Sequence, residues 1–165
     1  MIIFTPTVMH SGTHFLYADI LRDFKTSVMG SETKEEPQNI HTHVLDEKLP
    51  RFPKYLDLPI LVPMRHPARV YESWFRRKRK KIIDCDIQFG NMIDVVHPHN
   101  PMYLVIDHDE RDKRLSEISD KLGVKLSTEW LMGHGIVHNT GNCDITDQMM
   151  DRVPDFVMDF YEEVK

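Results

Sequence analysis

The chain has 165 residues, enough for a hydrophobic core of its own, and we expect a single domain over residues 1–165. Its net charge of −5 argues against a general nucleic-acid-binding protein, which is normally basic. Two cysteines are too few for a disulfide framework. No apolar run reaches the ~20 residues of a membrane span, and no basic leader precedes the first apolar run. We therefore expect a soluble, cytoplasmic protein.

The N-terminal residues predict a strand, a tight loop and a helix. The apolar run at residues 1–4 is typical of a short buried strand, which we expect Pro6 to end. A polar turn follows at residues 9–14, and apolar side chains then recur at helical spacing from Phe15 to Phe24. Such a loop binds anions, because its N–H groups and the helix dipole both favour negative charge. The alternative is an ordinary loop that caps a helix.

This loop lacks the parts of a usual ATP or GTP site. A Walker A loop needs two glycines and a lysine, whereas residues 9–14 contain one glycine, Gly12, and no lysine.

The next segment predicts a loop and then a strand that carries two histidines. Residues 25–39 are polar and contain Gly30 and Pro37, which favours a loop. Residues 40–45 predict a short strand, on which His41 and His43 share a face because side chains alternate. Two histidines at this spacing are also a good chelating pair, so a metal site is an alternative to a surface strand.

A second strand-to-helix junction follows. The apolar run at residues 59–64 predicts a buried parallel strand that Arg65 closes. Pro67 suits the first turn of a helix, which we expect to reach Lys80. Six consecutive cations at residues 76–81 predict either a solvated helix end or a docking surface for an acidic acceptor.

The rest of the chain continues the alternation of helices and strands. Residues 82–96 predict a short helix, with His97 and His99 in a loop after it, and residues 102–107 predict a strand. We expect helices over residues 110–122, ended by Gly123, and over residues 146–163, with an irregular segment between them. This pattern indicates an α/β fold with a central parallel sheet of about four or five strands, flanked by helices.

Two of these segments resemble the cofactor motifs of sulfotransferases. Residues 10–13, His-Ser-Gly-Thr, are similar to the turn that holds the 5′-phosphosulfate in that family. Residues 65–73 are similar to its 3′-phosphate motif, with arginine, proline and serine in register. Both motifs occur in the family's order, each at a strand-to-helix junction, with the histidine-bearing strand between them. The resemblance spans roughly residues 1–123 and implies the P-loop-like sulfotransferase fold.

The resemblance also implies a reaction. The chain would transfer a sulfuryl group from 3′-phosphoadenosine 5′-phosphosulfate to a hydroxyl or amine, leaving adenosine 3′,5′-bisphosphate, with no metal. His43 falls at the position of the catalytic base, and His41 stands where the family has a lysine. Phe15 falls where an aromatic ring stacks on adenine. The cofactor-binding residues implied are His10, Ser11, Gly12, Thr13, His14, Phe15, Arg65 and Ser73.

The chain departs from the family at two places. His10 stands where a lysine or arginine usually stabilises the leaving phosphate, and histidine does this only when protonated. If His10 acts as that cation, turnover should fall between about pH 6 and pH 8; His14 or His41 could substitute for it. The family's C-terminal basic loop is also missing, and residues 139–141, Asn-Thr-Gly, could offer neutral donors instead.

Two other functions stay open. One is a metal-dependent hydrolase or metal-binding domain that uses His41, His43 and one or two of His10, His14, Asp107 and His108. The other is a nucleotide-binding module without catalysis. For the sulfotransferase, the acceptor could be a small molecule or a glycan, and the basic run would suit an acidic one. The sequence does not predict an oligomeric state.

Overall fold

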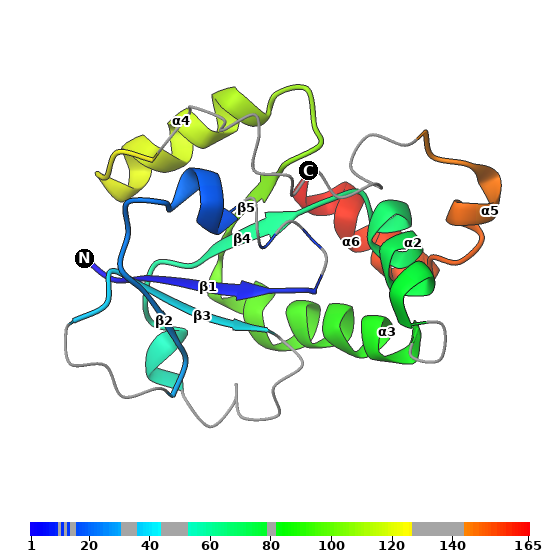
Figure 1. Cartoon of the computed structure of the whole chain (residues 1–165), viewed down its shortest axis with the longest axis horizontal. Coiled ribbons are helices and arrows are strands. Elements are labelled where there is room, and N and C mark those ends of the chain that lie inside the picture. Colours follow the sequence, from blue (N-terminus) through cyan, green and yellow to red (C-terminus); the bar gives the residue numbers. More distant parts are fainter. Residues whose placement is uncertain are drawn as a thin grey trace.

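The structure, a computed structural model, describes residues 1–9, 11, 13, 16–30, 36–43, 53–78, 82–126 and 144–165. These residues form a mixed α/β fold in which helices cover short parallel strands (Figure 1). The predicted α/β class is therefore confirmed. No helix in these ranges is long and apolar enough to cross a membrane.

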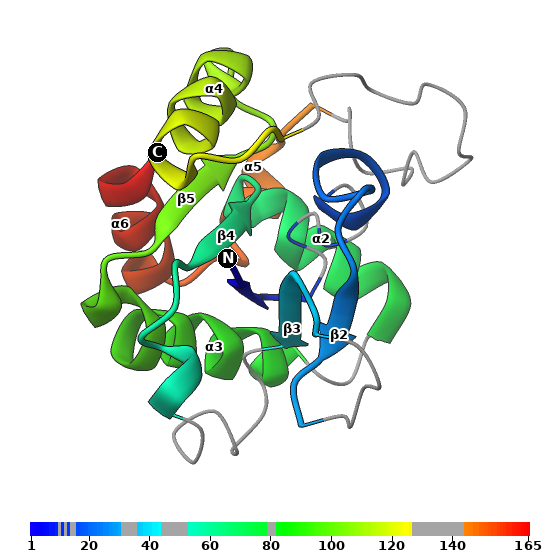
Figure 2. The same ribbon diagram turned by 90° about the vertical axis from the view of Figure 1, so that its left-hand side faces the viewer.

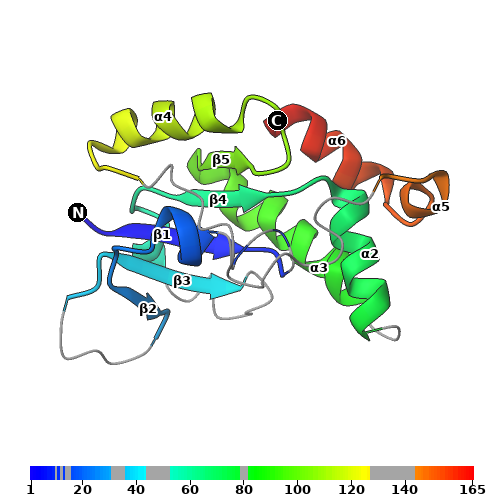
Figure 3. The ribbon, with the colours of Figure 1, turned by 45° about the horizontal axis from the view of Figure 1, so that its top comes forward.

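The strands form two parallel sheets that lie side by side (Figure 3). The three-stranded sheet has the order β1-β3-β2, and the two-stranded sheet pairs β4 with β5. A single bridge between Phe4 and Ile60 joins β1 to β4, which gives the spatial order β2-β3-β1-β4-β5. The strands are β1 (Ile3–Thr7), β2 (Thr26–Val28), β3 (Asn39–His43), β4 (Leu61–Met64) and β5 (Met102–Val105).

Two prolines explain why the seam between β1 and β4 has only one bridge. The N–H of Phe4 donates to the carbonyl of Pro59 at 2.9 Å, so even positions of β1 face odd positions of β4. The next positions on these facing edges are Pro6 and Pro63, and neither has an N–H to donate. The ladder therefore stops after Phe4. The prediction that Pro6 ends the strand was wrong, because the hydrogen bonds of β1 to β3 use the other edge.

Helices cover both faces of the strands (Figure 2). One face packs under η1, a π-helical turn, and α4, around a core that includes Ile3, Leu61 and Leu104. The other face packs against α2, α3 and α6, around a core that includes Phe4, Val62 and Trp74. The helical segments are η1 (Leu16–Ile20), η3 (Pro53–Tyr55), α2 (Pro67–Lys78), α3 (Ile82–Asn91), η4 (Met92–Val96), η5 (His97–His99), α4 (Arg111–Leu122), α5 (Asp147–Met150) and α6 (Asp155–Val164).

Several predicted elements need correction. The polar segment at residues 25–39 contains the short edge strand β2, and the helix expected to run to Phe24 is only the turn η1. The last helix is two helices, because Pro154 has no N–H to continue α5 and instead caps α6. Phe156, expected on the apolar side of that helix, is 45% exposed. The helix ending at Gly123 is confirmed, with this glycine at φ 64°.

Candidate functional site

The site lies where the strand connections change direction. The segment after β1 crosses to the η1 face, whereas the segment after β4 enters α2 on the opposite face. In parallel α/β sheets, ligands bind at the carboxyl ends of strands at such a switch point. Here three neighbouring carboxyl ends carry polar side chains: His43 ends β3, Thr7 ends β1, and Arg65 follows β4.

The structure covers only part of the predicted site. Ser11, Thr13, Arg65 and Ser73 of the predicted cofactor contacts are described, as are the two histidines of β3. Outside the described residues lie His10, Gly12, His14 and Phe15, together with residues 139–141 and the cations at 79–81.

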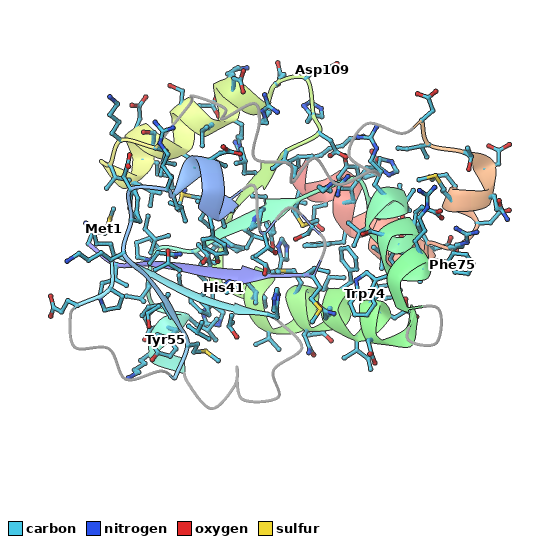
Figure 4. All side chains as sticks on the ribbon, viewed as in Figure 1. Met1, His41, Tyr55, Trp74, Phe75 and Asp109 are labelled. Atoms are coloured by element: carbon cyan, nitrogen blue, oxygen red, sulfur yellow. The ribbon has the colours of Figure 1, made fainter. Side chains whose placement is uncertain are left out.

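His41 lies beneath η1, beside the middle of β1 (Figure 4). Its Nδ1 is 3.1 Å from the carbonyl oxygen of Thr5, so Nδ1 must carry a proton. The ring meets Tyr17 edge-on at 4.8 Å and His43 at 4.9 Å, which confirms that the two histidines share a face. Burial lowers the pKa of His41 to about 4, and the hydrogen bond to Thr5 opposes this shift. The lowered pKa favours the neutral form of His41 at pH 7.

Tyr17 fastens η1 to the strands. Its hydroxyl is 2.8 Å from the hydroxyl of Thr5, which in turn donates to the Asn39 side chain at 3.0 Å. Because the single hydroxyl proton of Thr5 goes to Asn39, the Tyr17 hydroxyl is the donor toward Thr5, and burial raises the pKa of Tyr17, which keeps the phenol protonated. This network links η1, β1 and β3 on the face that carries the histidines.

His43 connects to the loop after β1 through two hydroxyl groups. Its Nδ1 is 3.1 Å from the hydroxyl oxygen of Thr7, its partner in the parallel ladder. The hydroxyl of Thr13 donates to the same oxygen at 3.2 Å. Thr7 is fully buried. The candidate base and the candidate phosphosulfate loop are thus joined by one continuous hydrogen-bond chain.

Ser11 closes the turn after β1 rather than pointing its groups outward. Its N–H and its hydroxyl both donate to the carbonyl of Val8, at 3.2 and 2.7 Å, and the residue is fully buried. In this arrangement the Ser11 hydroxyl stabilises the turn. Of these two described hydroxyl groups, that of Thr13 is therefore the better candidate to donate a hydrogen bond to an anion.

The loop after β1 is attached to the two helices that follow β4. The carbonyl of Met9 accepts from the indole N–H of Trp74 in α2 at 3.2 Å, near the carboxyl end of β1 (Figure 4). The N–H of Met9 donates to Gln88 in α3 at 2.7 Å. Ser73, the predicted 3′-phosphate ligand, precedes Trp74 and is buried. The residues directly beside the two segments that resemble the cofactor motifs, Met9 and Trp74, are therefore in contact.

Replacing Trp74 by phenylalanine should loosen this contact while keeping an aromatic ring in the core. We expect the free energy of unfolding to fall by about 1–2 kcal/mol, because one hydrogen bond and part of a buried side chain are lost. Urea unfolding measures this loss. Amide hydrogen exchange at Ser11 should accelerate more than exchange in α4, and equal acceleration at both places would contradict a specific role for the Trp74 bond.

Asp107 holds the start of α2 beside Arg65. Its carboxylate, 10% exposed, accepts from the N–H of His66 at 3.0 Å and from the Arg69 guanidinium at 2.8 Å. His66 in turn accepts from the N–H of Ala68 at 3.2 Å through Nδ1, and burial lowers its pKa. Arg65 is only 5% exposed, so its backbone and side chain are held at the end of β4.

Two of the metal ligands considered from the sequence, Asp107 and His108, lie far from His41 and His43. Asp107 and His108 follow β5, three strands from β3, which is roughly 14 Å at about 4.8 Å per strand. They therefore cannot share an ion with His41 and His43. Within the ranges that the structure describes, no group of three or more histidine, cysteine, aspartate or glutamate side chains could hold a metal ion.

Arg76, the first cation of the basic run, forms an ion pair within the protein. Arg76 pairs with Glu72 at 2.6 Å, and Glu72 also pairs with Arg152. The Arg152 guanidinium lies 4.1 Å from the centre of the Phe75 ring. These contacts give Arg152 a structural role beside α2, so it is not available to replace the family's C-terminal basic loop.

Comparison of the chain with models of known families, with curated proteins and with solved structures finds no match in any of the three. Sequence reasoning had missed Thr7, Trp74 and Gln88. The two-residue spacing of Thr5 and Thr7 was a usable signal for Thr7, because it matches that of His41 and His43 on the neighbouring strand. Nothing in the local sequence marks Trp74 or Gln88, since each acts through a contact with a distant segment.

Proposed function

We propose that the protein transfers a sulfuryl group from 3′-phosphoadenosine 5′-phosphosulfate to a hydroxyl or amine, on a P-loop-like sulfotransferase fold. The observation that carries the proposal is the contact between Met9 and Trp74, with His43 at the end of the neighbouring strand. This contact joins the residues directly beside the two segments that resemble the cofactor motifs, at a switch point of parallel strands. This supports a single ligand that spans both segments.

The donor groups present suit an anionic nucleotide. Arg65 offers a planar guanidinium at the end of β4, and Ser73 and Thr13 offer hydroxyl groups from α2 and from the loop after β1. Arg65 and Ser73 would hold the 3′-phosphate, and Thr13 would hold the 5′-phosphosulfate. The role of His10 as a cation stays a prediction, as do the roles of Gly12, His14 and Phe15.

His43 is the general base of the proposed reaction. The acceptor oxygen or nitrogen attacks sulfur in line with the phosphate oxygen, the bond from that oxygen to sulfur breaks, and the bisphosphate leaves with the electron pair. The acceptor proton passes to His43. Since Nδ1 faces Thr7, the proton would go to Nε2. Positioning and charge stabilisation would supply most of the catalysis. We propose a small molecule or a glycan as the acceptor.

Thermal unfolding with adenosine 3′,5′-bisphosphate tests the nucleotide site. Ligand at ~100 times its Kd adds about 2.7 kcal/mol to the stability, which should raise Tm by roughly 5–10 °C at this chain length. Arg65→Ala should abolish the shift. Arg114 on α4 has a half-exposed side chain, and Arg114→Ala should keep the Tm shift.

Parallel samples with ATP plus Mg²⁺ and with Zn²⁺ separate the alternatives. A shift with Zn²⁺ and none with the bisphosphate would overturn the sulfotransferase proposal in favour of a metal site. A shift with the bisphosphate that persists in Arg65→Ala would move the nucleotide to a different place on the protein.

A further inference from the structure

The hydroxyl chain between Thr13 and His43 determines where the imidazole carries its proton. Thr7 has one hydroxyl proton and lies between two polar groups, the Thr13 oxygen at 3.2 Å and His43 Nδ1 at 3.1 Å. Thr13 donates to Thr7, so the proton of Thr7 has His43 as its acceptor. A neutral His43 must then carry its own proton on Nε2. In this state Nε2 cannot take a proton from an acceptor.

An anion bound in the loop would reverse the direction of the hydrogen bonds from Thr13 through Thr7 to His43. The oxygens of a phosphosulfate or a phosphate accept hydrogen bonds and donate none. When Thr13 donates to such an oxygen, its own oxygen becomes an acceptor for the Thr7 proton. The Thr7 oxygen then accepts a proton from Nδ1 of His43, and the lone pair of the ring moves to Nε2.

We propose that Thr7 is a positioning residue that sets His43 as a base only when the nucleotide occupies the loop after β1. The inference rests on the proposed function, and it adds regulation to that site: binding of the sulfuryl donor switches the tautomer of the base. In the protein without nucleotide, His43 holds the tautomer that cannot accept the proton.

His41 provides an internal reference for this switch. Its Nδ1 faces the carbonyl of Thr5 at 3.1 Å, and a carbonyl has no proton to give. The proton of His41 is therefore fixed on Nδ1 whatever binds to the loop. The two ring centroids are 4.9 Å apart, and among the described residues His43, not His41, connects to Thr13 through Thr7.

Nitrogen NMR of protein labelled with ¹⁵N-histidine reads the tautomers directly. At pH 8, above the reference histidine pKa of ~6.5, the ring signals of His41 and His43 are assigned with the variants His41→Asn and His43→Asn. We expect His43 to be protonated on Nε2 without ligand and on Nδ1 with saturating adenosine 3′,5′-bisphosphate. His41 should be protonated on Nδ1 in both samples.

Two substitutions at Thr7 provide the matched comparison. Thr7→Val keeps the shape but removes the hydroxyl, so the His43 tautomer should no longer respond to the bisphosphate. Thr7→Ser keeps the hydroxyl and should restore the response. With 3′-phosphoadenosine 5′-phosphosulfate as donor, Thr7→Val should lower the transfer rate about five- to tenfold, the worth of one hydrogen bond.

The outcomes separate this inference from the proposed function. If the bisphosphate raises Tm but His43 keeps one tautomer with and without it, the switch is overturned and the nucleotide site stands. The same conclusion follows if Thr7→Val and Thr7→Ser respond alike. If the bisphosphate does not bind at all, the proposed function fails, and the switch fails with it.

Discussion

Replacing His43 by asparagine is expected to lower the rate of sulfuryl transfer by roughly 10²–10⁴-fold, the usual contribution of a positioned general base. Asparagine can still form a hydrogen bond to Thr7, but it cannot take a proton from the acceptor. The rate is followed as release of adenosine 3′,5′-bisphosphate from 3′-phosphoadenosine 5′-phosphosulfate. A phenol, a sugar and an amine are tested as acceptors. Transfer to water is expected to be the slowest reaction.

The same substitution on the neighbouring histidine is the control. His41→Asn removes a ring that meets His43 edge-on, but His41 does not join the hydroxyl chain that leads to Thr13. We expect its transfer rate to stay within about tenfold of the wild type. Both variants should keep the Tm shift with the bisphosphate. Equal losses of rate in the two variants would remove His43 from the role of base.

Acidification should destabilise the protein through His41. Burial lowers the pKa of this residue to about 4 in the folded state, against a reference of 6.5 when unfolded. The unfolded chain therefore binds the extra proton first as the pH falls. Stability is fully present above pH 6.5 and is lost between pH 6.5 and pH 4, by an amount that reaches roughly 3 kcal/mol.

Urea unfolding of the wild type and of His41→Asn, at pH 7, 5.5 and 4.5, isolates this contribution. Asparagine can donate to Thr5 in place of Nδ1–H, but it does not titrate. His66, whose pKa burial also lowers, contributes to both proteins and cancels in the comparison. The variant should lose less stability on acidification than the wild type. If acidification lowers the free energy of unfolding equally in the two proteins, the pKa of His41 is not lowered in the folded state.

The α/β class and most strands could be predicted from the sequence, because buried parallel strands are short apolar runs and helices are periodic. The failures have particular causes. Pro6 was misjudged because its missing N–H affects only one edge of β1, and the sequence does not tell which edge is paired. The strand β2 is only three residues long, and its one buried side chain is the polar Ser27 whereas Val28 is exposed, so the local pattern gave no signal for it.

The sequence predicted several residues of the candidate site, but not the hydrogen bonds that join them. The histidine pair of β3 was found from its two-residue spacing on a predicted strand, and Arg65 from its position at the end of one. Their partners could not be found, because the ladder that places Thr7 beside His43 depends on which strands become neighbours. Trp74 lies on α2, and its indole N–H reaches the loop after β1 only because the fold brings these two segments together.

The proline pair at the seam has a mechanical consequence. His43 and Thr7 belong to one hydrogen-bonded ladder, and the chain that leads to Arg65 belongs to the other. Beyond Phe4 the two ladders are held together by side-chain packing rather than by backbone rungs. Packed surfaces can slide slightly without breaking hydrogen bonds, whereas a complete ladder cannot. In the proposed site, the distance between His43 and Arg65 is therefore the one that can change most easily.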